Sequence, residues 1–173
     1  DALWADVTTV DPMFARRMAQ RADRQGIRYI DSPVAGTKPH AEQAQLVFYV
    51  GGDEDDFKTA LPFMEMMGQK AMHIGQVGGG ASLKMLVNMM LAQSMLVYSE
   101  AVLLGKSMGL DEALLLDVLP TLPVIAPFTK FKTEMIKNDD YAVQFPLEWM
   151  QKDLHLASLC AYEFKQPLFM TNL

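Results

Sequence analysis

The hydrophobic pattern of the chain changes near residue 77, from short apolar runs to long stretches with helical period. The first part carries short β-rich runs at residues 3–7, 27–31, 46–50 and 71–74. Helical segments are predicted between them, over residues 12–25 and 53–67. The order β-α-β-β-α-β is typical of the second half of a Rossmann-like α/β sheet, and we expect one antiparallel strand near its edge.

Local signals place the ends of these two helices. Asp11 is a capping residue followed by a proline, which favours the first helical position, and Gly26 ends the same helix. The second helix begins with an acidic first turn, which suits the positive end of a helix dipole, and Gly68 ends it. The α/β character of this first region therefore follows from turn and cap chemistry as well as from periodicity.

After Gly78 the pattern is helical throughout. The predicted helices cover residues 80–108, 112–119, 127–137 and 146–164, with Gly109 after the first and Asp111 as cap of the second. We place a domain boundary between residues 77 and 78. The fold class is α/β, with an incomplete sheet domain at 1–77 followed by an all-α domain at 78–173.

Lys84 and Asn88 lie one turn apart on the long helix, after three consecutive glycines. The run from 83 to 104 is apolar almost all round, so we expect this helix to be buried on most sides. An ammonium group there costs several kcal/mol unless it has partners or a cleft, which favours a functional role. The alternative is a lysine that extends its stem to solvent, with Asn88 as a solvated neighbour.

Composition narrows the possible partners. The 173 residues are half hydrophobic and carry a net charge of −6, which argues against nucleic acid or an anionic membrane surface as the main partner. Polar residues interrupt the longest apolar stretches, which favours a helix packed in protein over one that faces lipid. The single cysteine, Cys160, excludes an internal disulfide and fits a cytoplasmic location, and the scattered histidines predict no metal site.

Four segments in order resemble the β-hydroxyacid dehydrogenase family, which includes 3-hydroxyisobutyrate dehydrogenase and the glyoxylate and succinic semialdehyde reductases. They are DVTTVDP at 6–12, DSPVAGT at 31–37, GGGASLKMLVN at 78–88, and FPL at 145–147 followed by KDL at 152–154. The resemblance implies an oxidoreductase that uses NAD or NADP. It also implies that 1–77 belongs to an NAD(P)-binding domain and 78–173 to a substrate and dimerisation domain, in a homo-oligomer.

The resemblance identifies Lys84 as the catalytic acid/base. Reduction of a carbonyl by hydride puts negative charge on its oxygen, to which an ammonium can donate a proton, and oxidation of the alcohol needs the neutral amine. Burial against apolar side chains lowers a lysine pKa toward the working range. Asn88 resembles the residue that binds the substrate or holds the lysine, although a helix-interior amide can also have a purely structural role.

Further site residues follow from the same resemblance. Ala35, Gly36 and Thr37 would bind a substrate carboxylate through outward backbone N–H groups, unless they form an ordinary turn. The cofactor contacts would come from Thr9, Phe145 and Lys152. The alternatives are a helix-capping hydroxyl for Thr9 and a surface ion pair for Lys152.

The substrate class implied is a small hydroxy acid or aldehyde acid. The loop TKPHAE at 37–42 is closer to the glyoxylate and succinic semialdehyde reductase branch. No G-x-G-x-x-G occurs in the chain, and family members carry that phosphate-binding turn upstream, so we expect an internal fragment that is inactive alone. The alternative function is a non-enzymatic interaction or dimerisation module on the same fold.

Overall fold

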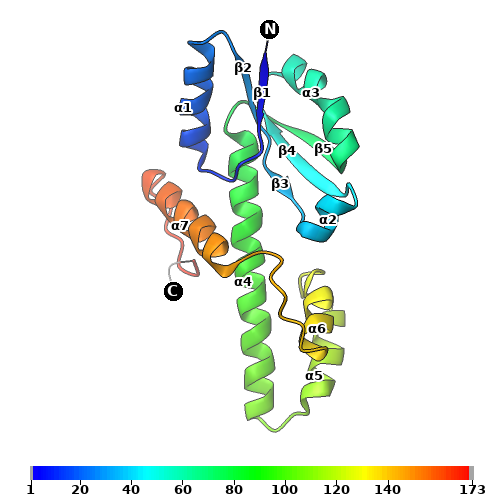
Figure 1. The fold of residues 1–173 in the computed structure, drawn as a ribbon. Helices are drawn as coiled ribbons and strands as arrows, with labels where there is room; N and C mark the ends of the chain where they lie inside the picture. The colour runs from blue at the N-terminus through cyan, green and yellow to red at the C-terminus, as the bar shows by residue number, and fades with distance from the viewer. Residues whose placement is uncertain (1, 172–173) are drawn as a thin grey trace. The chain divides into compact units, whose positions relative to one another are not determined.

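The computed structural model describes residues 2–171 and places five strands in one sheet (Figure 1). Spatial packing divides the chain into two compact units, one formed by residues up to 89 together with those from 144 onward, the other by residues 90–143. The predicted boundary after residue 77 marks the change from sheet to helix, whereas the compact units divide within a helix. The domain boundary between residues 77 and 78 therefore stays a prediction.

The α/β part of the first unit follows the predicted order. Its elements are β1 (Leu3–Asp6), α1 (Pro12–Asp23), β2 (Arg28–Asp31), β3 (Val34–Ala35), α2 (Lys38–Glu42), β4 (Leu46–Gly51), α3 (Glu54–Met67) and β5 (Gly68–Gly75). Asp11 caps α1 by accepting from the backbone N–H of Phe14 at 2.7 Å, as its position before Pro12 predicts. The elements β3 and α2 were not predicted, because each is too short to leave a periodic signal.

Strand directions correct one expectation. β1 and β2 are parallel to each other, while β4 is antiparallel to β2 and β3. Because β5 is parallel to β4, two strands run against β1 and β2, and not one. The reason is the connection from Ala35 to Leu46, which is shorter than the dozen or more residues that a parallel crossover needs. The connection from β4 to β5 contains α3 and does form such a crossover.

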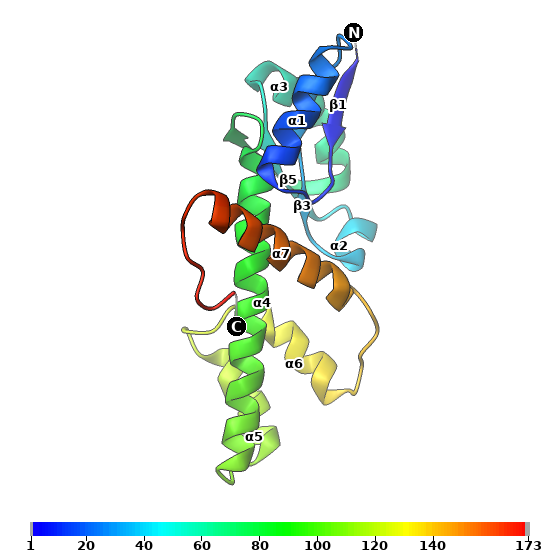
Figure 2. The ribbon, with the colours of Figure 1, turned by 90° about the vertical axis from the view of Figure 1, so that its left-hand side faces the viewer.

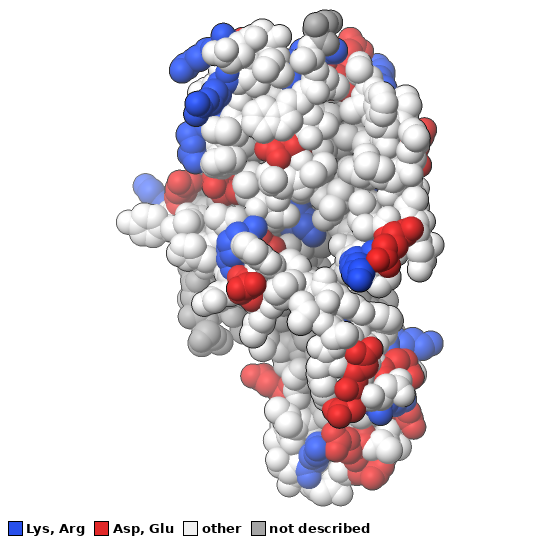
Figure 3. Space-filling view, in the orientation of Figure 1, with Lys and Arg blue, Asp and Glu red and all other residues white. Residues whose placement is uncertain are grey.

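The sheet has a helix on each side, with α1 and α3 on opposite faces in Figures 1 and 2. A core cluster between the sheet and α3 consists of Ile30, Phe48, Val50, Ala60 and Met64. Arginines concentrate on α1, which carries Arg16, Arg17 and Arg21 and produces a basic stripe over this helix in Figure 3. Helical geometry thus gathers positive charge that the sequence does not show as a run.

The remaining helices are α4 (Gly79–Ser107), α5 (Glu112–Val118), η1 (Leu119–Thr121), α6 (Thr129–Lys137) and α7 (Leu147–Glu163). In the first unit, Met85 of α4 packs against Ala157 and Cys160 of α7. In the second unit, Tyr98 of α4 lies in a core cluster, and its hydroxyl is 2.5 Å from the Thr133 hydroxyl of α6. The end of α4 and the cap of α5 by Asp111 agree with the prediction.

The long helix α4 differs from its expected burial. Its side chains at 86, 90, 96, 97, 103 and 104 are about half exposed or more, so within the described residues it is not buried on most sides. By length and composition, with mean hydropathy 1.3 over an 18-residue window, it is also long and apolar enough to cross a membrane, a test that core helices of soluble proteins pass as well. The predicted absence of a membrane partner stays a prediction.

Candidate active site

A buried carboxylate fixes the start of α4 against the sheet. Asp31, at the end of β2, accepts from the backbone N–H of Gly78 with Oδ1 and from that of Ala81 with Oδ2, both at 2.7 Å. Burial raises the pKa of the Asp31 carboxyl, and these two N–H groups oppose the increase. The interaction satisfies backbone donors that every helix start leaves without an intrahelical partner. Sequence reasoning did not assign this role to Asp31.

Gly80 allows α4 to approach the sheet closely. A Cβ at this position would lie 2.1 Å from the carbonyl oxygen of Tyr49 and 3.0 Å from that of Asp31. By contrast, a Cβ at Gly79 would meet its nearest neighbour, Ile74, at 3.5 Å, which is an ordinary contact. The middle glycine of this segment therefore differs from the last one, and of these two it is Gly80 that limits the helix-to-sheet distance.

Lys84 lies one turn after Gly80 and is only 9% exposed. Burial lowers the pKa of its ammonium, the Asp153 carboxylate opposes this effect, and the Lys152 ammonium adds to it. Within residues 2–171, no hydrogen bond or ion pair of the Lys84 amine is recorded. Lys84 is thus a buried amine with a lowered pKa and with no hydrogen bond or ion pair within the described residues.

Asn88 is buried and joined to α7. Its Nδ2 donates to Oδ2 of Asp153 at 2.5 Å, and Asp153 itself is 3% exposed. The other oxygen, Oδ1, lies 2.8 Å from Nζ of Lys152, but the angles do not make a hydrogen bond. Oδ1 therefore lacks a hydrogen-bond partner within the described part of the chain, although it forms an ion pair with Lys152.

Lys152 reaches from α7 to the loop after β1, where its Nζ donates to the carbonyl oxygen of Thr9 at 2.7 Å. Asp6 holds the start of this loop by accepting from the backbone N–H and the hydroxyl of Thr8, at 3.1 and 2.7 Å. We call the connected residues Thr9, Lys152, Asp153 and Asn88 the polar chain. It links the loop after β1 to the helix that carries Lys84, and all its members belong to the first compact unit.

The structure does not join every predicted residue to this cluster. Ala35 belongs to β3, Gly36 has φ +127°, and the N–H of Thr37 donates to Nδ1 of His40 at 3.2 Å. Phe145 is 40% exposed. No hydrogen bond or ion pair between any of these four predicted residues and Lys84 or Asn88 is recorded within 2–171. Their roles in substrate and cofactor binding stay predictions.

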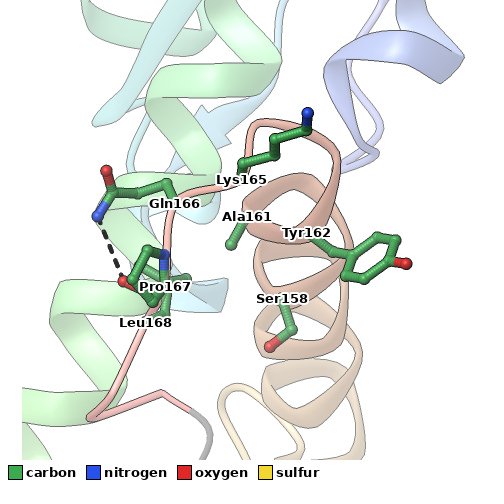
Figure 4. A pocket seen from close by; sticks show the side chains of 7 residues that line it. All are labelled: Ser158, Ala161, Tyr162, Lys165, Gln166, Pro167 and Leu168. Carbon is green, nitrogen blue, oxygen red and sulfur yellow. Dashed lines mark hydrogen bonds between the residues drawn. The ribbon is translucent and has the colours of Figure 1, made fainter.

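A cavity of about 410 Å³ lies at the end of α7, away from the predicted site residues in sequence (Figure 4). Its lining residues are Ser158, Ala161, Tyr162, Lys165, Gln166, Pro167 and Leu168. The amide of Gln166 donates to the carbonyl oxygen of Pro167 at 3.3 Å, within this lining. None of the residues proposed from the sequence lines the cavity.

Comparison with known proteins covers the chain in two parts. Residues 1–75 match a family model described as the NAD binding domain of 6-phosphogluconate dehydrogenase. Residues 78–173 match one described as the NAD-binding region of NADP-dependent 3-hydroxyisobutyrate dehydrogenase. The expected cofactor class, NAD or NADP, agrees with both descriptions, and the two matches meet at the predicted change from sheet to helix.

Two curated relatives and one solved structure extend this result. The chain is 34% identical to the chloroplastic glyoxylate/succinic semialdehyde reductase 2 of Arabidopsis thaliana, with 89% of this chain and 43% of the relative covered. It is 33% identical to the mitochondrial 3-hydroxyisobutyrate dehydrogenase of Drosophila melanogaster, with 100% and 56% covered. A 3-hydroxyisobutyrate dehydrogenase from Mycobacterium tuberculosis, solved with L-serine, superposes with a TM-score of 0.89 at 29% identity, over 98% of this chain and 61% of that one. The chain spans about half the length of the curated relatives.

Proposed function

The chain belongs to the β-hydroxyacid dehydrogenase family, and from this premise we propose that the whole protein is an oxidoreductase dependent on NAD or NADP. It interconverts a small hydroxy acid and the corresponding aldehyde or keto acid by hydride transfer, with Lys84 as general acid/base. The observation that carries the proposal is the state of Lys84, whose amine is buried, has a lowered pKa and has no recorded partner within residues 2–171.

The proposed chemistry uses both protonation states of Lys84. When bound, NAD or NADP would provide the hydride chemistry, and the protein residues handle the proton. In the direction of reduction, the Lys84 ammonium donates a proton to the carbonyl oxygen as negative charge develops there, and in the direction of oxidation the neutral amine takes the hydroxyl proton. A lowered pKa makes the two forms accessible nearer to neutral pH. Asn88, one turn away, would bind the same substrate oxygen or orient it.

The residues present fit the nicotinamide end of the cofactor. Ligands of open α/β sheets bind at the carboxyl ends of the strands, and the loop that contains Thr9 follows the carboxyl end of β1. Asp153 Oδ1 is a buried acceptor that a ribose or substrate hydroxyl could satisfy. We propose that Thr9, Phe145 and Lys152 contact the cofactor.

The substrate carboxylate is proposed to bind at Ala35, Gly36 and Thr37. In the described conformation the N–H of Thr37 already donates to His40, so carboxylate binding there would have to replace this bond. The loop from 37 to 42 and the names of the relatives support short aldehyde acids such as glyoxylate and succinic semialdehyde as candidates. Methylmalonate semialdehyde is the corresponding candidate for a 3-hydroxyisobutyrate dehydrogenase.

The test is the consumption of NADH and NADPH by the whole protein with each of these three aldehyde acids, beside the variant Lys84→Met. General acid/base groups contribute about 10²- to 10⁴-fold, so a loss of that size is expected. Lys106→Met is a matched control, because Lys106 is a half-exposed lysine of the same helix that pairs with Glu112. Turnover that survives in Lys84→Met as well as in Lys106→Met would overturn the proposed role.

A second candidate function is an interaction or dimerisation module. It is favoured by the exposed apolar side chains of α4, among them Leu96, Leu103 and Leu104. This alternative predicts no turnover with any pair of cofactor and substrate, together with a stable oligomer in light scattering. A homo-oligomer is also proposed for the enzyme, so turnover, and not the oligomeric state, discriminates the two.

We also propose a cytoplasmic location for this protein, although the two curated relatives cited above are chloroplastic and mitochondrial.

A further inference from the structure

We propose that Asp153 is a positioning residue for Lys84, because its buried carboxylate ties the helix that carries Lys84 to the loop after β1. The inference rests on the proposed function, in which Lys84 is the acid/base. It goes further because it gives Asp153, which does not itself react, an influence on the protonation state of Lys84.

The geometry of the polar chain supports this role. Each carboxylate oxygen of Asp153 faces a different partner: Oδ2 accepts from Asn88 of α4, and Oδ1 lies 2.8 Å from the ammonium of Lys152. Lys152 in turn donates to the Thr9 carbonyl. Asp153 is only 3% exposed, so its carboxylate depends on these protein partners rather than on water. Its loss would release both neighbours at once.

The charges around Lys84 give the polar chain a chemical effect. The charged groups that act on the Lys84 amine are Asp153, which raises its pKa, and Lys152, which lowers it. Both belong to α7. On the sheet side, the Asp31 carboxylate contacts α4 at the helix start, where it accepts from two backbone N–H groups, and it is not among the groups that shift the pKa of Lys84. Lys84 therefore titrates in a field set mainly by burial and by two adjacent residues of α7.

This arrangement predicts opposite responses to two substitutions. Asp153→Asn removes the carboxylate that favours the ammonium form, so the Lys84 pKa falls further and the amine becomes neutral at lower pH. In alcohol oxidation, which needs the neutral amine, the acidic limb of the pH–kcat profile moves to lower pH. Lys152→Met removes a like charge, so the same limb moves to higher pH.

Asn88→Ala is the matched control. It removes the hydrogen bond to Asp153 Oδ2 and keeps both charges, so it should lower kcat without displacing the limb. A purely structural role of Asp153 predicts the same behaviour for Asp153→Asn as for Asn88→Ala. The direction of the pH displacement therefore separates electrostatic positioning from packing.

The experiment records pH–kcat profiles of the whole protein and of the three variants, and also the pH dependence of Lys84 acetylation by acetic anhydride, followed by mass spectrometry. Acetylation needs the neutral amine but no turnover, so it reports on Lys84 even in an inactive variant. Displacements in opposite directions for Asp153→Asn and Lys152→Met support the inference. Identical profiles, or displacement in the same direction, overturn it.

Two outcomes remain distinguishable. If Lys84→Met leaves turnover unchanged, the proposed function is refuted. If Lys84→Met abolishes turnover but Asp153→Asn does not displace the acidic limb of the pH–kcat profile, only the role of Asp153 is refuted. If Asp153→Asn does not fold, as circular dichroism would show, Lys152→Met carries the test alone. Its limb must then move to higher pH, and an unmoved or lowered limb refutes the inference.

Discussion

Replacing Gly80 by alanine tests the packing that positions Lys84. The new Cβ would lie 2.1 Å from the Tyr49 carbonyl oxygen, about 1.3 Å inside the 3.4 Å at which ordinary contact begins. The obstructing atoms belong to backbone, and the N–H of Tyr49 is itself bonded to Pro33 at 3.0 Å. The strand cannot yield without loss of sheet hydrogen bonds, so α4 must move away from the sheet.

The expected cost follows from these distances. Overpacking of a core costs about 1–3 kcal/mol when side chains can adjust, and a clash with backbone lies at or above the upper end. Alanine gains about 0.5–1 kcal/mol over glycine in a helix, which offsets only a small part. We therefore expect Gly80→Ala to lower the free energy of unfolding by about 3 kcal/mol. For a chain of this size that corresponds to roughly 6–12 °C in Tm.

Gly79→Ala is the internal control, because it adds the same methyl group one residue earlier, where the nearest atom is 3.5 Å away. This variant should be neutral or slightly stabilised. Urea denaturation of both variants, with the midpoint and the m-value fitted together, gives the two free energies. Equal stability of the two alanine variants would refute the claim that Gly80, and not Gly79, limits the helix-to-sheet distance.

Three further predictions concern stability. The pKa of Lys84 is lowered in the folded state, so between that pKa and the ordinary lysine value the unfolded chain binds more protons than the folded one. The free energy of unfolding should therefore rise with pH in this window. Urea titrations at several pH values should show this slope in the wild type and a flatter one in Lys84→Met. Asp31→Ala leaves the N–H groups of Gly78 and Ala81 without their acceptor, so the free energy of unfolding should fall by about 2–3 kcal/mol in the same assay. A decrease no larger than that of an ordinary surface substitution would contradict this prediction. Ala44 has φ +53°, so Ala44→Gly should raise the urea midpoint by the equivalent of about 0.5 kcal/mol; an unchanged or lowered midpoint would show that this conformation is not strained.

Local chemistry was sufficient to predict most elements. Asp11 and Asp111 cap their helices by accepting backbone N–H groups three residues later, and the signals for both lie within a few residues of sequence. Gly26 adopts φ +67°, which suits the helix end predicted there. The α/β class and the change to helix after residue 77 follow from the same short-range patterns.

The interactions that build the candidate site are not local, which is why the residues alone did not reveal them. Asp31 meets Gly78 47 positions later, Asn88 meets Asp153 65 positions later, and the contact from Lys152 to Thr9 spans 143 positions. Periodicity cannot report such pairs. The resemblance located Lys84, Asn88 and Lys152, but the part played by the two aspartates emerged only from the fold.

The two aspartates act at opposite ends of the same helical segment. Asp31 holds the backbone at the start of α4 through Gly78 and Ala81, which lie before Lys84. Asp153 holds the side chain of Asn88, one turn after Lys84. Lys84 is thus bracketed by two buried carboxylates, of which one fixes where the helix lies and the other biases the charge of the amine. Buried charges are costly unless they have partners, and here each carboxylate has its own: backbone N–H groups for Asp31, and Asn88 with Lys152 for Asp153. Under the proposed function, two carboxylates on both sides of an amine with no hydrogen bond or ion pair within residues 2–171 would give Lys84 one position and one protonation equilibrium, which is what proton transfer to a substrate oxygen needs.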